Sequence, residues 1–162
     1  MKLHLGCGKR FIPGFIHIDA VDYPHVDHVS SIDHLSFIQD GTVDLIYNCH
    51  VLEHFKRREV DRVLQEWRRV LKPGGVLLVA VPHISMFDPN YHEIWRFTPE
   101  GLANLLGRVF GTAHVTLRTY GNSLTAAGEI RGVVADEFSR AELDNHDPRF
   151  ALEVCARAVT PN

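Results

Sequence analysis

Residues 2–20 read KLHLGCGKRFIPGFIHIDA, and this stretch contains two short apolar runs separated by a glycine turn. The first run ends at Gly6-Cys7-Gly8, and the second ends at Asp19. A strand that ends in a glycine turn, followed by a strand that ends in an acid, is typical of α/β sheets that bind nucleotides or nucleosides. The stretch therefore predicts the first two strands of such a sheet, with the turn and the acid at its ligand-binding edge.

Strand-like and helix-like patterns alternate through the rest of the chain. Apolar residues at helical spacing over Val60–Leu71 predict an amphipathic helix, which KPGG at 72–75 ends because proline cannot continue a helix. Six consecutive apolar residues, Val76–Val81, predict a strand that is covered on both faces of a parallel sheet. Further strands are predicted at residues 24–29, 43–47 and 114–120, and further helices at 51–55, 98–109 and 123–140.

The last apolar run has a different pattern. Residues 150–159 alternate apolar and polar side chains, which predicts an antiparallel or edge strand. Strands that alternate with helices indicate an open, doubly wound α/β sheet, and 162 residues are enough for one domain, residues 1–162. In this architecture ligands bind at the carboxyl ends of the strands.

Composition argues against several classes of protein. The formal net charge is −3 and the lysines and arginines form no basic stripe, so we expect no nucleic-acid partner. No apolar run is long enough to cross a membrane, and the strand pattern begins at once, so we expect no secretory leader and a cytoplasmic protein. Cys7, Cys49 and Cys155 are odd in number and far apart, which predicts reduced thiols without a disulfide framework.

The spacing after the glycine turn narrows the choice of ligand. A dinucleotide site needs G-x-G-x-x-G at the start of a helix, with an acid about 20 residues further on. Here Asp19 follows Gly8 by eleven residues, too few for a normal helix and a second strand. The phosphate-binding helix is therefore shortened or missing, which is evidence against NAD and FAD. A nucleoside without phosphates does not need that helix, and Asp19 can still accept both ribose hydroxyls.

Five blocks follow one another over nearly the whole chain: KLHLGCG, PGFIHIDA, DGTVDLIYNCHVLEHF, EWRRVLKPGGVLLVAVP and NYHEIWRFTPEGL. In this order and spacing they resemble the class I S-adenosylmethionine-dependent methyltransferases, especially the compact methyltransferase type 11 group. The resemblance implies a Rossmann-like, mostly parallel seven-stranded sheet with an antiparallel last strand. It also implies S-adenosylmethionine as the cofactor.

The same resemblance implies the roles of five cofactor-binding residues. Gly6, Cys7 and Gly8 would pass under the methionine part of the cofactor, and Asp19 would bind the ribose. Asn48, just past the fourth strand, would touch the methionine end.

Other positions depart from the family pattern. His4 stands where an acid is frequent, and Arg10 stands where a third glycine is frequent. The residue that meets the adenine falls at Ser31, with Asp33 as a displaced substitute. The usual N-terminal lid helices are absent, so we expect either a partly open cofactor or a cover from a partner subunit or a second copy.

The segment YNCHVLEHF at 47–55 has a second interpretation. His50, Glu53 and His54 spell H-x-x-E-H, a two-histidine zinc signature of peptidases. Glu53 would then be a general base, or the same residues would hold a metal within a methyltransferase. A structural alternative is that Glu53 or His54 hydrogen-bonds the backbone at the start of a helix. The zinc reading explains five residues and none of the surrounding blocks, so we expect no metal site.

Methyl transfer requires in-line positioning of the acceptor, plus a base where the acceptor is a hydroxyl or an ammonium. His50, His83 and His92 are the candidate bases, because each follows a predicted strand or lies in the long segment 83–97. Tyr91, Trp95 and Phe97 could shape an acceptor pocket, or they could simply hold this segment on the core.

We therefore predict an S-adenosylmethionine-dependent methyltransferase that acts on a small-molecule acceptor. Oxygen methylation of a sugar, lipid or metabolite is the first expectation, by family analogy. One alternative is a module of the same fold that binds the cofactor or a partner without turnover. A third is a metal-dependent hydrolase that uses His50, Glu53 and His54.

Overall fold

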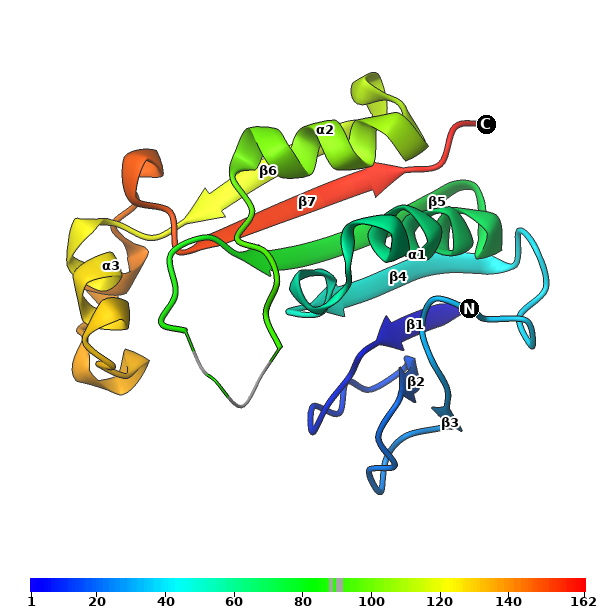
Figure 1. The fold of residues 1–162 in the computed structure, drawn as a ribbon, viewed down its shortest axis with the longest axis horizontal. Helices are drawn as coiled ribbons and strands as arrows, with labels where there is room; N and C mark the ends of the chain where they lie inside the picture. The colour runs from blue at the N-terminus through cyan, green and yellow to red at the C-terminus, as the bar shows by residue number, and fades with distance from the viewer. Residues whose placement is uncertain (88, 90–91) are drawn as a thin grey trace.

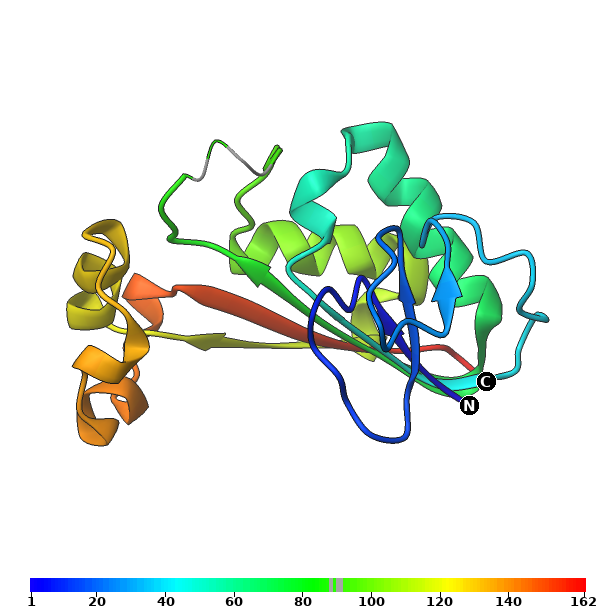
Figure 2. The ribbon, with the colours of Figure 1, turned by 90° about the horizontal axis from the view of Figure 1, so that it is seen from below.

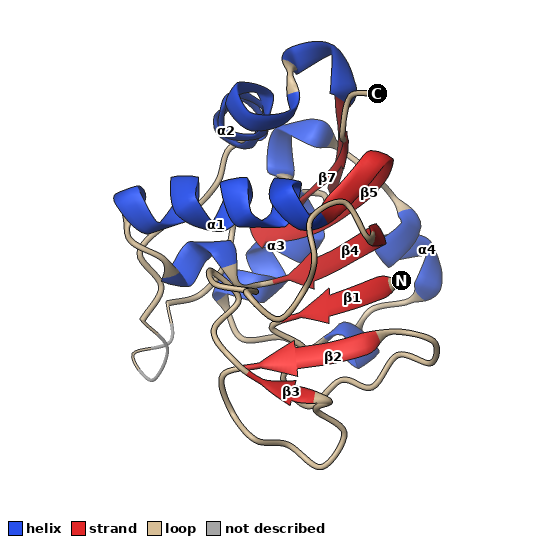
Figure 3. Cartoon of the chain, turned by 90° about the vertical axis from the view of Figure 1, so that its right-hand side faces the viewer, coloured by secondary structure: helices blue, strands red, loops and turns tan. Residues whose placement is uncertain are grey.

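The computed structural model covers residues 1–162 and describes all of them except residues 88, 90 and 91. Within the described residues, seven strands form one sheet in the order β3-β2-β1-β4-β5-β7-β6 (Figures 1 and 3). The strands are β1 (Lys2–Leu5), β2 (Ile16–Asp19), β3 (His28–Val29), β4 (Val43–Cys49), β5 (Leu71–Pro82), β6 (Val115–Tyr120) and β7 (Glu153–Val159). β1 to β5 pair in parallel, whereas β7 is antiparallel to both β5 and β6. The predicted Rossmann-like sheet with an antiparallel last strand is confirmed.

The strand order reverses between β1 and β4. From β1 the chain moves outward to β2 and β3, and it then returns to place β4 on the other side of β1. The loops that leave the carboxyl ends of these two strands therefore diverge, which opens a crevice where α/β sheets bind ligands.

Two long helices follow β4 and β5: α1 (Arg57–Val70) and α2 (Pro99–Phe110). The Glu59 side chain accepts the backbone N–H of Lys56 at the start of α1. Thr98 caps α2 by accepting the Gly101 N–H over 3.1 Å, and Pro99 is the first helical residue, as predicted. The short helices are α3 (Ser123–Ile130) and α4 (Arg140–Asp144), with 3₁₀ turns η1 (Leu52–His54), η2 (Thr112–His114), η3 (Ala135–Glu137) and η4 (Pro148–Phe150).

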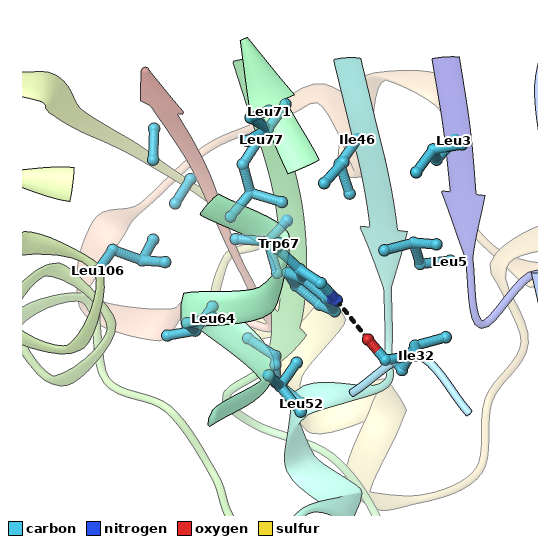
Figure 4. Close-up of a cluster of buried hydrophobic side chains, with 14 of the residues drawn as sticks. Leu3, Leu5, Ile32, Ile46, Leu52, Leu64, Trp67, Leu71, Leu77 and Leu106 are labelled. Carbon is cyan, nitrogen blue, oxygen red and sulfur yellow. Dashed lines mark hydrogen bonds between the residues drawn. The ribbon is translucent and has the colours of Figure 1, made fainter. Parts of the chain in front are cut away.

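The core lies between the two long helices and one face of the sheet (Figure 4). Trp67 of α1 is fully buried, and its indole N–H donates to the Ile32 carbonyl over 3.0 Å. This bond ties α1 to the segment after β3 and satisfies the polar atom of a large apolar side chain. Burial of each such side chain stabilises the fold by about 1.5 to 3 kcal/mol. The apolar side chains around Trp67 include Leu3, Leu5, Ile46, Leu52, Leu64 and Leu77.

Both long helices lie on the same face of the sheet (Figure 2). The connections from β1 to β2 and from β2 to β3 are loops that bring aromatic rings and histidines together. The ring of His4 lies 5.1 Å from that of Tyr47 and 5.4 Å from that of His17, measured between centroids. His4 and His17 are buried, so these loops, in place of helices, cover this part of the sheet. The missing phosphate-binding helix is thus confirmed.

Four sequence-based boundaries were wrong. The helix predicted at 123–140 ends at Ile130, because Gly132 takes a left-handed conformation (φ +73°) and Ser139 then caps a separate helix, α4. The helix at 51–55 is only the 3₁₀ turn η1. The third strand shrinks to His28–Val29, and residues 148–150 form η4 before the last strand begins. None of the helices in the described part of the chain is long and apolar enough to span a bilayer.

Candidate cofactor and acceptor site

The glycine turn after β1 is fixed by backbone geometry. Gly6 and Gly8 have φ angles of +64° and +53°, which only glycine adopts without strain. A Cβ on Gly6 would overlap Cγ2 of Val51, so this residue lies against the segment after β4. A Cβ on Gly8 would meet no atom within 4 Å. The turn is therefore tightly packed at Gly6 and open at Gly8, where a ligand can approach the backbone.

Asp19 is joined directly to this turn. Its Oδ2 accepts the Gly8 N–H over 2.7 Å, and its Oδ1 accepts the Val21 N–H over 2.9 Å. The side chain is largely buried, and each carboxylate oxygen keeps a further lone pair. Cys7, between the two glycines, is buried, and burial raises the pKa of its thiol to about 11, so it is a packing residue at neutral pH.

Asn48 brings an amide to the same edge from β4. Its Nδ2 donates to the Leu5 carbonyl over 2.9 Å, which links the carboxyl ends of β4 and β1. The residue is fully buried, and its Oδ1 has no hydrogen-bond donor among the described residues. The structure therefore brings Gly6, Gly8, Asp19 and Asn48 together at the switch point, as the sequence predicted.

Ser31 and Asp33 lie after β3 and contact each other. The Ser31 hydroxyl donates to Asp33, and Arg62 of α1 donates to the other oxygen of the same carboxylate. These bonds, first that of Ser31, lower the pKa of Asp33. Asp33 thus anchors α1 to this loop, and an adenine contact by either residue stays a prediction.

His50 begins a second group of polar side chains, at the carboxyl end of β4. It is the one non-glycine residue in the described chain with a positive φ, +55°. Its Nε2 lies 3.0 Å from Oε2 of Glu153 on β7, and its Nδ1 lies 3.6 Å from Oε1 of Glu53. The hydrogen bond with Glu153 and the charge of Glu53 raise the pKa of His50. A strained backbone and two carboxylates thus hold a half-exposed imidazole at the mouth of the sheet.

Glu53 is fully buried although it carries a carboxyl group. Neither of its oxygens has a hydrogen-bond donor among the described residues, and burial raises the pKa of the group. Two imidazoles lie near its Oε1: Nδ1 of His50 at 3.6 Å and Nε2 of His54 at 4.0 Å. A buried carboxyl group without hydrogen-bond donors lowers the stability of the folded protein, and such groups cluster at functional sites.

Sequence reasoning missed Glu153. It lies 103 residues from His50, and no local motif marks it. The antiparallel pairing of β7 was a usable signal, because it places the first residue of β7 beside Pro82, the last residue of β5. Glu153 is thereby brought to the carboxyl edge of the parallel strands.

The other two candidate bases lie in the segment between β5 and α2. His83 is partly buried, its backbone N–H donates to the Leu152 carbonyl over 2.7 Å, and its Nδ1 has no donor or acceptor among the described residues. His92 is exposed, and its carbonyl lies 3.3 Å from Nδ1 of His54. The indole N–H of Trp95 donates to the Phe55 carbonyl over 2.7 Å, so Trp95 fastens this segment to the chain after η1. The predicted contribution of Tyr91 lies outside the described residues.

The zinc interpretation required an α-helix across His50 and His54. The structure instead has the left-handed His50 followed by the 3₁₀ turn η1, so the two rings are not ligands one helical turn apart. Among the residues that the structure describes, no three His, Cys, Asp or Glu side chains are grouped to hold a metal ion. The geometry gives no support for zinc ligation.

Known proteins match part of this chain in sequence. A family model described as "Methyltransferase domain" matches residues 11–79. A curated protein of Mycolicibacterium smegmatis, named "Probable S-adenosylmethionine-dependent methyltransferase", is 36% identical over 72 residues, which are 42% of this chain and 26% of that protein. Part of this chain is therefore similar to a methyltransferase domain and to an S-adenosylmethionine-dependent methyltransferase. The chain spans about a quarter of the length of this curated relative.

Several solved methyltransferases share the fold across nearly the whole chain. An S-adenosylmethionine-dependent methyltransferase from Archaeoglobus fulgidus has a TM-score of 0.66 and 16% identity, covering 98% of this chain and 85% of that one. The complex of the Haloferax volcanii Trm112 activator with a methyltransferase has a TM-score of 0.62 and 15% identity, covering 99% of this chain and 82% of that one. The Burkholderia thailandensis 1,6-didemethyltoxoflavin-N1-methyltransferase was solved with S-adenosylhomocysteine. Its TM-score is 0.62 and its identity 15%, covering 99% of this chain and 71% of that one. At these identities the likeness establishes the fold alone.

Proposed function

We propose that this chain binds S-adenosylmethionine and transfers its methyl group to a small-molecule acceptor. The observation that carries the proposal is the bond between the Gly8 N–H and the Asp19 carboxylate, 2.7 Å long, at the switch point of a methyltransferase sheet. It joins the open glycine turn and the acid into one unit at the edge where this fold holds its cofactor.

The residues at this edge fit S-adenosylmethionine. The open space beside Gly8 admits a ligand against the backbone, and the spare lone pairs of Asp19 can accept ribose hydroxyls. The orphaned Oδ1 of Asn48 suits an N–H donor such as an α-ammonium group. Ser31 or Asp33 would lie toward the adenine. When bound, the cofactor supplies a methyl group already activated by its sulfonium.

The chain contributes position and proton transfer. The carboxyl ends of β4 and β5 and the amino end of β7 bring His50, His83 and Glu153 to one edge, next to the segment that carries His92. An acceptor held there must be aligned with the methyl group and, where it carries a proton, must lose it. His50, between two carboxylates, is the best-placed group to relay that proton. His83 and His92 are further candidates on the same side.

The acceptor class is the open part of this proposal. The sequence favoured an oxygen atom on a sugar, lipid or metabolite, and that expectation rests on family analogy.

We also propose that a partner subunit or a second copy of the chain covers the glycine-turn side of the site. Phe11 and Val21, on the two loops beside this turn, are 60% and 52% exposed. Exposed apolar side chains beside a ligand site favour burial by another surface. Light scattering of the purified chain would show a dimer, and a monomer at high micromolar concentration would remove the second copy as the cover.

Formation of S-adenosylhomocysteine from S-adenosylmethionine tests the proposed activity. Purified, chelator-treated protein is incubated with small alcohols, amines, phenols and sugars, and the product is measured by mass spectrometry. Acceptor-dependent product would support the proposal. Tight binding of S-adenosylhomocysteine without turnover on any acceptor would favour a non-catalytic binding module. Absence of this product, together with zinc-dependent hydrolysis of a peptide or ester substrate, would favour the hydrolase alternative.

A further inference from the structure

Four buried oxygen atoms near the carboxyl end of β4 and the amino end of β7 have no hydrogen-bond donor among the described residues. They are Oδ1 of Asn48, both carboxylate oxygens of Glu53, and Oε1 of Glu153. All four are acceptors, and two of them belong to a fully buried carboxyl group. Folded proteins rarely leave buried acceptors unpaired, so this edge is short of donors.

The described residues nearby do not make up the shortage. His50 lies between the two carboxylates, 3.0 Å from Glu153 and 3.6 Å from Glu53, and an imidazolium offers two N–H donors at most. Glu93 adds a third carboxylate whose charge also acts on His50, and Arg96 is 2.7 Å from Glu93 and so is already engaged. His54 brings a further imidazole, but its Nε2 is 4.0 Å from Oε1 of Glu53, which is beyond hydrogen-bond distance, so the four oxygens stay without donors in the described part of the chain.

Of the residues in this group, His50 and Glu153 reach solvent and Glu53 lies buried behind them. The side chain of His50 is 50% exposed and that of Glu153 is 24% exposed, whereas that of Glu53 is 1% exposed. A cation that binds beside His50 and Glu153 meets negative charge in a partly desolvated setting, where attraction between charges is strong.

We propose that the methyl acceptor is a primary or secondary amine, which binds as its ammonium ion against the carboxylates of Glu53 and Glu153. This inference rests on the proposed methyltransferase function. An ammonium ion brings a positive charge and two or three N–H donors to acceptors that have none. A neutral alcohol brings one donor and no charge, and it would leave most of these oxygens unpaired.

Transfer to an amine requires a change of protonation that this group can supply. The ammonium gives one proton to the Glu53 carboxylate, and the proton leaves to solvent by way of His50. The freed nitrogen lone pair forms a bond to the methyl carbon while the carbon–sulfur bond breaks and its electron pair stays on sulfur. The products are the methylated ammonium, S-adenosylhomocysteine and one proton.

The cofactor also carries an ammonium group, so the same oxygens have a second source of donors. Asn48 is bonded to Leu5 at the end of β1, and we assign its free oxygen to the cofactor. Glu53 and Glu153 flank His50, and β7, which carries Glu153, is separated from β1 by β4 and β5, so we assign these two glutamates to the acceptor.

Neutral isosteres separate these assignments. Glu53→Gln and Glu153→Gln remove one charge each, and Glu100→Gln on the exposed first turn of α2 is the matched control. Glu153 is the more exposed of the two positions, so its variant tests the idea even where the buried Glu53→Gln alters folding. Methyl transfer is measured on matched pairs with one carbon skeleton each: phenethylamine with phenethyl alcohol, pentylamine with pentanol, and glucosamine with glucose.

We expect methylated amines and no methylated alcohols. Each glutamate variant should lower kcat/KM for the amine at least about tenfold. Glu153→Gln should act mainly through KM, because it removes a charge-assisted contact, whereas Glu53→Gln should also lower kcat, because it removes the proton acceptor. Affinity for S-adenosylhomocysteine should stay within about twofold in both variants, and Glu100→Gln should match the wild type in both measurements.

Three results would overturn the amine assignment. They are methylation of the alcohols in preference to the amines, amine turnover unchanged by both glutamate variants, and wild-type protein that binds S-adenosylhomocysteine but neither binds nor methylates any amine of the panel. Loss of S-adenosylhomocysteine affinity in both glutamate variants would place these residues on the cofactor instead. Failure of the wild type to bind S-adenosylhomocysteine at all would contradict the methyltransferase proposal itself.

Discussion

The backbone N–H of Gly8 donates a hydrogen bond of 2.7 Å to Oδ2 of Asp19. This bond crosses the eleven-residue interval that replaces the usual first helix, so the acid at the end of β2 also holds the glycine turn at the end of β1. Asp19 has a structural role and a proposed ligand-binding role at one position. Experiments on it must measure both.

Asp19→Ala should weaken binding of S-adenosylhomocysteine by about 1 to 3 kcal/mol, because ribose hydroxyls would lose a buried partner. Calorimetric titration gives the affinity, and thermal unfolding of the free protein gives the structural part of the loss. Asp22→Asn, an exposed acid on the same loop, is the control and should bind as the wild type does. Unchanged affinity in Asp19→Ala would remove Asp19 from the site.

Gly6→Ala should destabilise the protein by about 2 to 5 kcal/mol. The new Cβ meets a left-handed backbone and overlaps Val51, and the two costs add. Gly14→Ala is the matched control, because Gly14 also has a positive φ (+80°) but has free space around it, so it should cost about 1 to 2 kcal/mol. Chemical denaturation measures both.

A double-mutant cycle separates the two costs at Gly6. Adding Val51→Ala removes the overlapping methyl group, so the double variant should be more stable than the sum of the single changes predicts, by at least about 1 kcal/mol. Strict additivity would show that Val51 does not press on the turn.

His4 should make the protein less stable as the pH falls from about 6.5 to 4. Its pKa is lowered to about 4, first by burial and then by the charges of His17, Arg10 and His25. The folded state therefore holds His4 neutral in a range where the unfolded chain takes up a proton, and stability is full above the unfolded pKa and falls as pH drops toward the folded one. The contribution is at most about 3 kcal/mol.

The difference between wild type and His4→Phe isolates this effect from other titrating groups. Between pH 7.5 and 4 the difference in unfolding free energy should shift steadily in favour of His4→Phe, because phenylalanine keeps the ring contacts with Phe15 and Tyr47 but cannot be protonated. A constant difference across this range would mean that His4 does not titrate differently on folding.

His92→Ala should lower turnover about tenfold or more and leave cofactor affinity unchanged, as expected for a general base. The His54 bond is made to the backbone carbonyl of His92, so removal of the ring spares that contact. His114→Ala, at an exposed histidine of η2, is the control. A normal rate in His92→Ala would assign the residue to structure and leave His50 and His83 as the bases to test.

Periodicity and turn residues were sufficient to predict most of the fold. The glycine turn, the six-residue apolar run of β5, the Thr98-Pro99 helix start and the alternation of β7 each depend on local chemistry that the sequence displays directly. The helix boundary at Ile130 was missed because one glycine, Gly132, outweighed an otherwise helical composition.

The site was harder to predict than the fold. Gly8 and Asp19 are marked by their places after two strands, so they could be found from the chain alone. Glu153 could not be found in this way, because its nearness to His50 depends on the position of β7 within the sheet. The burial of Glu53 depends likewise on tertiary packing, which includes a hydrogen bond from the Ile94 N–H to its carbonyl. Long-range contacts of this kind leave no local pattern in a single sequence.

Calorimetric titration of the purified, chelator-treated chain with S-adenosylhomocysteine tests the central claim most directly. A single site with a dissociation constant in the micromolar range, about −8 kcal/mol, is the predicted result, and it should weaken in Asp19→Ala. The absence of any heat of binding from a folded protein, across concentrations that reach the millimolar range, would contradict the claim that the Gly8–Asp19 unit is a cofactor site.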